Sequence, residues 1–397
     1  IFDRAERRSE RTRLAFAYLP TGGSSGLAAQ FDLPLGDLGS GVVNTVPSVY
    51  GGSPTATIAR ATTAWTRLAT GLYASVAAGS LRSYYDADGG YRGYLPQTQK
   101  INYALWSDDL TQIATWVATT MTTSMTATGA DGAANTATIL TATAGNATIL
   151  QTLTRASAQR ITSCWIKRRT GSGVINMTQD NGVTWTPVTV TSDWTQVAIA
   201  AATAANPILG FQIVTIADAV DVMWVLHEEA AFASATPIPT TTATVTQNGD
   251  QLSYPSAGNF DETAGTAYAE IYPLTVGSNM PSTYLLMDTG AASGFMAYIG
   301  ATGILQAGDG TNFPSSSGVL QANTLYKTAS SWGGNGLNVC KNGGTLGTGS
   351  FDGTLGTTPT NIRVGWRGTG QQPDACIQNA RIWKAQKSNA QLLAMTV

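Results

Sequence analysis

Short stretches in which hydrophobic and polar residues alternate recur along most of the chain. The alternation is clearest in residues 161–166 (ITSCWI) and 220–225 (VDVMWV). A period of two places successive side chains on opposite faces of a strand, so each stretch predicts a strand with one buried face. Turn residues separate these stretches about every 8–12 residues, the spacing typical of a β-sandwich. No repeat of about 20–50 residues is present, which disfavours propellers, solenoids and β-helices.

The hydrophobic pattern divides the chain into three units. Residues 1–100 begin without steady periodicity, and their Gly- and Ser-rich segment predicts an N-terminal arm followed by a short-strand anchoring region. Residues 101–247 and 248–397 each predict a sandwich, joined by the Pro- and Thr-rich linker TPIPTTTATVTQ. The predicted fold class is all-β: two jelly-roll-type β-sandwiches preceded by an extended, loop-rich N-terminal region. Ser388, with Gln391 three residues later, has the spacing of a capping box and predicts a short C-terminal helix.

Charge is sparse for a chain of this length. Charged residues make up 12% of the 397 residues, about half the usual share of about 25%. The net charge is −2, so no broad basic field is available for nucleic acid or anionic lipid. No apolar run reaches the roughly 18 residues of a membrane-spanning helix, and no signal peptide is recognisable. A neutral, Thr- and Gly-rich surface suits a subunit packed inside a large assembly.

The three cysteines, Cys164, Cys340 and Cys376, are scattered and form no CxxC pair. A zinc site is therefore not expected, and no other metal or cofactor is predicted. An odd and sparse count fits assembly in a reducing cytoplasm, while a disulfide between Cys340 and Cys376 stays open. The chain begins at Ile1 and not at Met. A processed N-terminus and numbering from an internal residue both stay open.

The tripeptide Asp288-Thr289-Gly290 has the appearance of an aspartic-protease loop. Such an enzyme needs two carboxylates that share one proton, and a second tripeptide of this kind is missing from the sequence. Asp86 and Asp88 lie in a turn sequence that no hydrophobic strand precedes. The surrounding TYLLMDTGAASGFMAYIG is typical of strand, turn and strand, so we expect Asp288 to bend or cap a β-hairpin.

Other catalytic groups are isolated in the sequence. His227 is the only histidine, and no GxSxG nucleophile elbow supports a Ser-His-Asp triad that would use it. Glu228 and Glu229 are neighbours on a predicted strand and should point to opposite faces, which does not suit glycoside hydrolysis. Glu262 and Glu270 are expected to be solvated edge residues. We therefore predict no enzyme activity and no catalytic residues.

The chain has ten tryptophans, distributed over the predicted sandwiches. Trp165 and Trp224 lie within alternating strands and are predicted core residues. Trp332, in SSWGGNG, lies at a strand end beside a loop. It is the best single candidate for contact with a glycan or a partner protein, because an exposed indole can stack on a sugar ring. A role in the core or in an interface is the other interpretation.

Several phrases of the sequence, in order, resemble known domain families. GTAYAEIYPL, GLNVCKNGG, NIRVGWRG and the closing ACIQNARIWKAQKSNAQLLAM make residues 248–397 similar to laminin-G and concanavalin-A-like domains. SDWTQVAIAAAT and DVMWVLHEEAAF make residues 101–247 similar to carbohydrate-binding-module sandwiches, and LRSYYDADGGYRGYLPQTQKINYAL resembles the segment preceding them. Together they resemble tailed-phage virion structural proteins of the head-fibre, decoration or tail-fibre type. The chain departs from the pattern at residues 96–97 and 100–101, and it lacks the acidic pairs of calcium-binding laminin-G domains.

The resemblance implies a non-enzymatic virion protein that acts by assembly and surface adhesion. It would be assembled in the host cytoplasm, bind capsid or tail proteins through its N-terminal region, and form a homo-oligomer, with a homotrimer favoured. Two alternatives stay open. One is a glycan-binding receptor-recognition module of a tail fibre, whose partners would be host surface glycans. The other is a capsule-degrading enzyme, which would need paired carboxylates in one cleft.

Overall fold

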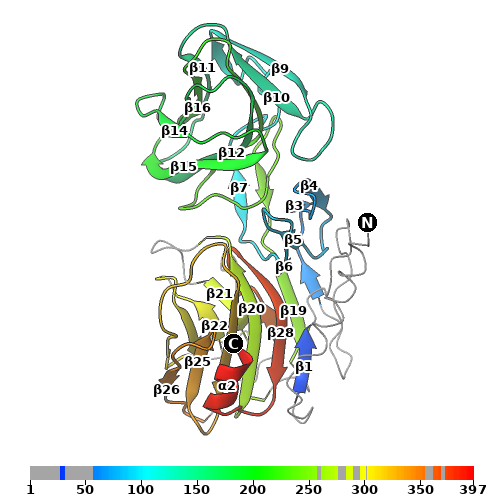
Figure 1. The fold of residues 1–397 in the computed structure, drawn as a ribbon, viewed down its shortest axis with the longest axis vertical. Coiled ribbons are helices and arrows are strands. Elements are labelled where there is room, and N and C mark those ends of the chain that lie inside the picture. The colour runs from blue at the N-terminus through cyan, green and yellow to red at the C-terminus, as the bar shows by residue number, and fades with distance from the viewer. Residues whose placement is uncertain are drawn as a thin grey trace, which may run out of the picture.

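The computed structural model describes residues 27–31, 57–256, 261–275, 283–288, 296–300, 302–353, 361–367 and 372–397. The regular secondary structure of the described chain consists of strands and one short helix, α2 (Asn389–Met395), near its end. Two sandwiches lie one above the other along the long axis of the molecule (Figure 1). The predicted all-β class with two sandwiches is confirmed. No helix in the described ranges is both long and apolar enough to cross a membrane.

The first sandwich consists of two five-stranded antiparallel sheets. One sheet has the order β15 (Thr195–Ala204), β12 (Ala158–Thr170), β17 (Ala219–Glu228), β10 (Ala137–Ala142), β9 (Met121–Ala127). The other has the order β14 (Thr186–Val188), β13 (Ile175–Thr178), β16 (Ile208–Ile213), β11 (Ala147–Thr152), β8 (Val117–Thr119). Trp116, Phe211 and Val222 are among the fully buried residues of the core between them. Each large aliphatic or aromatic side chain buried in this way contributes about 1.5–3 kcal/mol.

A β-bulge in β17 places two large side chains next to each other on the outer face of the first sandwich. The register between β12 and β17 shifts between Ser163 and Trp165, and Trp224 has a φ of 51°. Met223 and Trp224 therefore both join an outer hydrophobic cluster with Trp165. Trp165 and Trp224 are buried, as predicted, but the strict alternation read from the sequence ends at this bulge.

The second sandwich also has two antiparallel sheets, which draw strands from distant parts of the chain. The larger has the order β26 (Gly347–Gly349), β25 (Leu337–Lys341), β24 (Tyr326–Trp332), β20 (Gly265–Pro273), β28 (Ala375–Trp383), β6 (Tyr91–Tyr94), β5 (Ser83–Tyr85), and β1 (Leu27–Phe31) also pairs with β28. The other has the order β2 (Thr57–Ala59), β19 (Gln251–Pro255), β27 (Asn361–Val364), β21 (Thr283–Asp288), β22 (Met296–Ile299), β23 (Leu305–Gly308). Their shared core includes Leu252, Ile271 and Trp332.

The C-terminal helix α2 begins with the predicted capping box. Ser388 Oγ accepts a hydrogen bond from the Gln391 backbone N, and Gln391 Oε1 accepts one from the Ser388 backbone N. These two bonds satisfy groups that the first helical turn would leave unpaired. Leu392, on the buried side of the helix, packs with Tyr268 and Cys340 against the outer face of the larger sheet.

Residues 57–100 hold the two sandwiches together, and we call them the staple. Strands β2, β5 and β6 extend the sheets of the second sandwich. Between them, the hairpin of β3 (Ala64–Arg67) and β4 (Tyr73–Val76) packs on the first sandwich. Trp65 lies 5.0 Å from Trp224, and Tyr73 lies 5.4 Å from Trp165, measured between ring centroids. Residues before and after the boundary predicted near residue 100 therefore share sheets.

A buried charge cluster joins the staple to the start of the second sandwich. Arg60 Nη1 donates to Asp250 Oδ1 at 2.5 Å, and Arg82 Nη2 donates to Asp250 Oδ2; all three side chains are 0% exposed. Arg82 also donates to Gln97 Oε1 at 2.7 Å and to Thr236 Oγ1, in the linker, at 3.2 Å. Because buried charges are stable only when paired, this cluster fixes the staple, the linker and the second sandwich in one arrangement.

The linker between the sandwiches is held by further bonds. The strand β18 (Val245–Gln247) pairs with β7 (Lys100–Asn102). Asn102 Nδ2 donates to the carbonyl oxygens of Val225 and Ile238 at 2.9 and 2.8 Å. The Thr- and Pro-rich linker is thus extended, as predicted, but it is bound along its length to both neighbours.

Cys164, Cys340 and Cys376 are all free and buried. Cys340 lies in β25 and Cys376 in β28, with β24 and β20 between them in the sheet. Three steps of about 4.8 Å place the two strands roughly 14 Å apart. A disulfide needs Cα atoms within about 7 Å, so this fold leaves the pair unbridged.

Candidate functional site

Trp332 ends strand β24 and lies fully inside the second sandwich. Its side chain is 0% exposed, and its Nε1 donates to the carbonyl oxygen of Asp261 at 2.9 Å. A Cβ on Gly265, in the neighbouring strand, would lie 2.1 Å from the indole Cζ2, so the ring occupies the space that a side chain there would need. A direct stacking contact between Trp332 and a glycan needs an exposed ring face. The structure instead gives the core role, the other interpretation of this residue.

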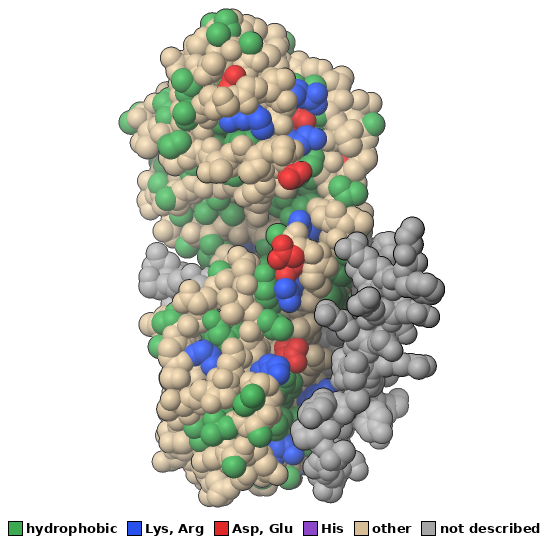
Figure 2. All heavy atoms as spheres, in the orientation of Figure 1, with side chains coloured by type: hydrophobic (Ala, Val, Ile, Leu, Met, Phe, Trp, Pro, Cys, Tyr) green, Lys and Arg blue, Asp and Glu red, His purple; other side chains and the backbone are tan. Residues whose placement is uncertain are grey.

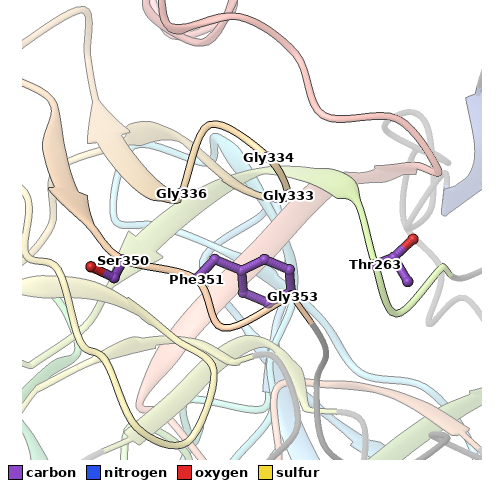
Figure 3. A pocket seen from close by; sticks show the side chains of 7 residues that line it. All are labelled: Thr263, Gly333, Gly334, Gly336, Ser350, Phe351 and Gly353. Atoms are coloured by element: carbon purple, nitrogen blue, oxygen red, sulfur yellow. The ribbon is translucent and has the colours of Figure 1, made fainter.

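A surface cavity lies next to the place that the sequence singled out. It has a volume of about 360 Å³, and one of its lining residues is Gly333, which directly follows Trp332. Its lining comes from the turn between β24 and β25, the segment after β26 and the residue two positions before β20: Thr263, Gly333, Gly334, Gly336, Ser350, Phe351 and Gly353. Figure 3 shows the Phe351 ring at the centre of this lining, with Thr263 to one side. Above the ring lies the turn between β24 and β25, residues 333–336, which we call the glycine turn.

The glycine turn of the cavity is fixed by hydrogen bonds from behind. Gly336 N donates to Gly333 O at 2.9 Å, and Gln386 Nε2 donates to Gly336 O at 2.7 Å. Gln386 Oε1 in turn accepts from the backbone N of Asn335 at 2.8 Å. Gly336 has a φ of 80°, and a Cβ there would lie 2.4 Å from the carbonyl oxygen of Gly349. The turn therefore requires glycine at 336 and keeps one shape.

The other walls are built from a half-buried aromatic ring and a hydroxyl-bearing turn. Phe351 packs against the core of the second sandwich. Asp261 Oδ1 accepts hydrogen bonds from Thr263 N at 2.9 Å and from Thr263 Oγ1 at 2.8 Å. These bonds hold Thr263 in place, and they are the main reason that the pKa of Asp261 is lowered from its usual value. Asp261 is thus ionised and already engaged at the edge of the site.

The seven lining residues carry no ionisable side chain. They offer one aromatic face, two hydroxyl groups and backbone groups of the four glycines, apart from Gly336 N, Gly336 O and Gly333 O, which already make hydrogen bonds within the protein. Such a site can bind an uncharged ligand through hydrogen bonds and ring contact, but its own side chains include no acid, base or strong nucleophile.

His227 lies far inside the first sandwich and is not arranged for acid–base chemistry. It is 0% exposed, and its Nδ1 lies 2.9 Å from Thr162 Oγ1. Burial, aided by the nearby Arg160, lowers the pKa of His227 to about 3. The ring is therefore neutral in ordinary buffers.

The glutamates considered for glycoside hydrolysis have other partners. Glu228 is buried and accepts hydrogen bonds from the backbone N and the hydroxyl of Ser234. Glu229 pairs with Arg160 at 2.6 Å. Glu270 is not an edge residue as expected: it lies in β20, inside the larger sheet, where it accepts bonds from Tyr268, Gln378 and Asn379. Glu262 lies half-buried ahead of β20.

The suspected protease tripeptide begins at the end of a strand. Strands β21 and β22 pair antiparallel, so the two predicted strands are present, with Asp288 closing β21 opposite Met296; the predicted turn between them lies outside the described residues. Thr289 and Gly290 lie outside the described residues. Asp86 accepts hydrogen bonds from the backbone N atoms of Asp88 and Gly90 and from Arg92, so it stabilises its own turn.

In the described part of the chain, no group of three or more His, Cys, Asp or Glu side chains is placed to hold a metal ion. The cavity residues Ser350 and Phe351 and the buried Arg60, Arg82 and Asp250 were not anticipated. The Gly-rich segment SSWGGNG could have indicated the cavity. Isolated arginines in a chain of low charge could have indicated the buried cluster of Arg60, Arg82 and Asp250.

Comparisons with known proteins give only weak similarities. No family model matches the chain, and no curated protein does. Among solved structures, domain 4 of AbnA, a GH43 extracellular arabinanase from Geobacillus stearothermophilus in complex with arabinotriose, is 12% identical, with a TM-score of 0.29; the match covers 43% of this chain and 84% of that one. Trypanosoma rangeli sialidase in complex with the inhibitor DANA is 11% identical, with a TM-score of 0.28, over 37% of this chain and 26% of that one. The tandem CBM22 domain of Paenibacillus barcinonensis Xyn10C is 10% identical, with a TM-score of 0.25, over 74% of this chain and 97% of that one. At these scores the matches identify no activity or ligand for this chain.

Proposed function

We propose that this chain is a non-enzymatic structural protein of a tailed-phage virion, which acts by assembly and surface adhesion. The two sandwiches form its projecting body, and its N-terminal region binds capsid or tail proteins. The order of the sequence segments that resemble tailed-phage virion domains suggests this class of protein. The observation that carries the proposal is the staple, with Arg60 and Arg82 closed on the buried Asp250.

The staple matters because two sandwiches joined by one linker would ordinarily move relative to each other. Here one segment packs its β3–β4 hairpin on the first sandwich and adds β2, β5 and β6 to the second. The linker is held by hydrogen bonds from Asn102 to the carbonyl oxygen of Ile238 and from Arg82 to Thr236 Oγ1. A body of this kind holds a binding surface at a fixed distance and angle from its attachment point, which is what an appendage needs.

The surface also suits assembly. Figure 2 shows a face that is mostly uncharged, with small groups of Lys, Arg, Asp and Glu side chains. Such a face can be packed against neighbours with few charges to desolvate. A homotrimer is our favoured state by analogy with threefold virion appendages.

The engaged state of the acidic groups supports a non-enzymatic role. Glu228, Glu229 and Glu270 each accept hydrogen bonds from neighbouring side chains. A carboxylate that activates water or protonates a leaving group must be available to substrate. We therefore expect the purified chain to leave polysaccharides intact.

The test is to find the chain in intact particles. Mass spectrometry and immunogold labelling of purified particles from the phage that encodes it should detect the chain at a capsid or tail position. Particles that lack the chain would overturn the virion role. Polysaccharide shortening by the purified chain, abolished by a substitution at one carboxylate, would overturn the non-enzymatic role.

A further inference from the structure

We propose that the cavity beside Trp332 binds a neutral sugar, as a single residue or at the end of a glycan chain. This inference rests on the proposed function, because it names the ligand class of the adhesion contact. Its volume of about 360 Å³ falls within the range of about 300–1,000 Å³ that small-molecule sites occupy.

The walls match the two kinds of surface that a sugar ring presents. A pyranose or furanose has an apolar face of C–H groups and a rim of hydroxyl groups. The ring of Phe351, central in the cavity, offers an apolar platform for the C–H face (Figure 3). The Ser350 hydroxyl makes no hydrogen bond with any described residue, so it is free to bond a sugar hydroxyl.

The glycines let a ligand approach the backbone. A Cβ added at Gly334 or at Gly353 would meet no atom within 4 Å, so the space in front of these residues is open. Peptide N–H and C=O groups can then serve as donors and acceptors without a side chain in the way. Sugar hydroxyls, which both donate and accept, are complementary to such a mixed set.

The absence of charge among the lining residues selects a neutral ligand. An acidic sugar would lose water on binding and gain no cation there, and Asp261 stands at the edge of the site. Asp261 is engaged by Thr263, and Asp352, between the lining residues Phe351 and Gly353, also has a partner, so neither carboxylate is left free for a cationic ligand. We therefore expect neutral hexoses, pentoses or N-acetylhexosamines to bind better than uronic or sialic acids.

The site is preorganised, which lowers the cost of binding. Gln386 and Asn338 hold the glycine turn through its carbonyl oxygens, at 2.7 Å from Gln386 to Gly336 and 3.2 Å from Asn338 to Asn335. Trp332 underlies the turn as part of the rigid core. Little free energy of binding is then spent on ordering the loop when a ligand binds.

The experiment titrates the full chain with a panel of neutral and acidic monosaccharides and disaccharides at millimolar concentration. Binding is read by saturation-transfer NMR and calorimetry. Gly334→Leu places a side chain in the open space without backbone strain, since Gly334 does not have a positive φ. Gly145→Leu, in an exposed turn of the first sandwich, is the matched control. We expect Gly334→Leu to weaken binding at least about tenfold, and the control to leave it unchanged.

A second pair of variants tests the aromatic platform. Phe351→Leu keeps apolar bulk against the core but removes the ring, and should weaken binding about tenfold; Phe351→Tyr keeps the ring and should restore it. Thermal unfolding of each variant checks that the second sandwich stays folded. No binding of any neutral sugar, or binding that Gly334→Leu leaves unchanged, would overturn the inference. If the chain is present in particles but binds no sugar, only the sugar site fails. If it binds sugar but is absent from particles, only the virion role fails.

Discussion

The charge cluster at the staple allows a quantitative prediction. Asp250 is 0% exposed and accepts from Arg60, from Arg82 and from the backbone N of Gln97. Asp250→Asn keeps the shape of the side chain but leaves two buried guanidinium groups without a counter-charge. Removing one partner of a buried ion pair costs about 3–5 kcal/mol. Arg60 keeps its bonds to the carbonyl oxygens of Thr62 and Ala77, which limits the loss to that range.

The same substitution should separate the unfolding of the two sandwiches. Because a loss of 1 kcal/mol lowers the Tm of a large domain by at least about 2 °C, Tm should fall by about 6–10 °C. Because the cluster couples the staple to the second sandwich, the single calorimetric transition expected for the native chain should split into two. Small-angle scattering should detect a broader distribution of distances between the sandwiches.

Two controls make this prediction sharp. Asp193→Asn, an exposed aspartate of the first sandwich, should change the free energy of unfolding by less than about 0.5 kcal/mol. Replacing all three charged residues by apolar ones, Arg60→Met, Arg82→Met and Asp250→Leu, should recover much of the loss, because no buried charge is left unpaired. If Asp250→Asn behaves like Asp193→Asn, with one unfolding transition, the coupling role assigned to the cluster is refuted.

Three further predictions follow from single groups. Burial lowers the folded-state pKa of His227 to about 3, so its neutral form stabilises the fold above pH 6.5, and that stability is lost as pH falls from 6.5 towards 3. His227→Gln should therefore reduce the dependence of the free energy of unfolding on pH in this range, measured by denaturant titration. An unchanged dependence would contradict the assignment. Burial raises the pKa of Asp374 to about 6, so its ionisation destabilises the fold as pH rises from about 4 to 6; Asp374→Asn should raise the free energy of unfolding at pH 7 by up to about 3 kcal/mol, and a less stable variant would disprove this. Gln386→Ala removes two bonds to the glycine turn and should cost about 1 kcal/mol while weakening sugar binding; unchanged binding would show that the turn keeps its shape without Gln386.

Local patterns predicted much of the fold. Alternation located the strands around Trp165 and Trp224, and the spacing of Ser388 and Gln391 located the helix cap. These features depend on neighbouring residues, so the sequence displays them directly. The bulge at Trp224 depends on the pairing of β17 with β12, and β2 and β6 join the second sandwich by pairing with β19 and β28; local pattern does not encode pairings between such distant segments.

The sequence pointed to Trp332, which is buried, and not to the residues that line the cavity beside it. SSWGGNG drew attention to Trp332 because an indole at a strand end can contact a ligand. The indole is instead buried in the core. The cavity is lined by the glycines that follow Trp332 and by Phe351, which lies just after β26. Whether an aromatic ring is buried or exposed depends on what packs over it, here Gly265 of a neighbouring strand.

The central claim is that this chain is a rigid, non-enzymatic appendage of a virion. Electron cryo-microscopy of intact virus particles produced by the source of this chain tests this claim most directly. The account predicts density at a capsid or tail position into which both sandwiches fit as one body, with the staple between them. Particles without such density, together with no chain detected by mass spectrometry, would contradict it.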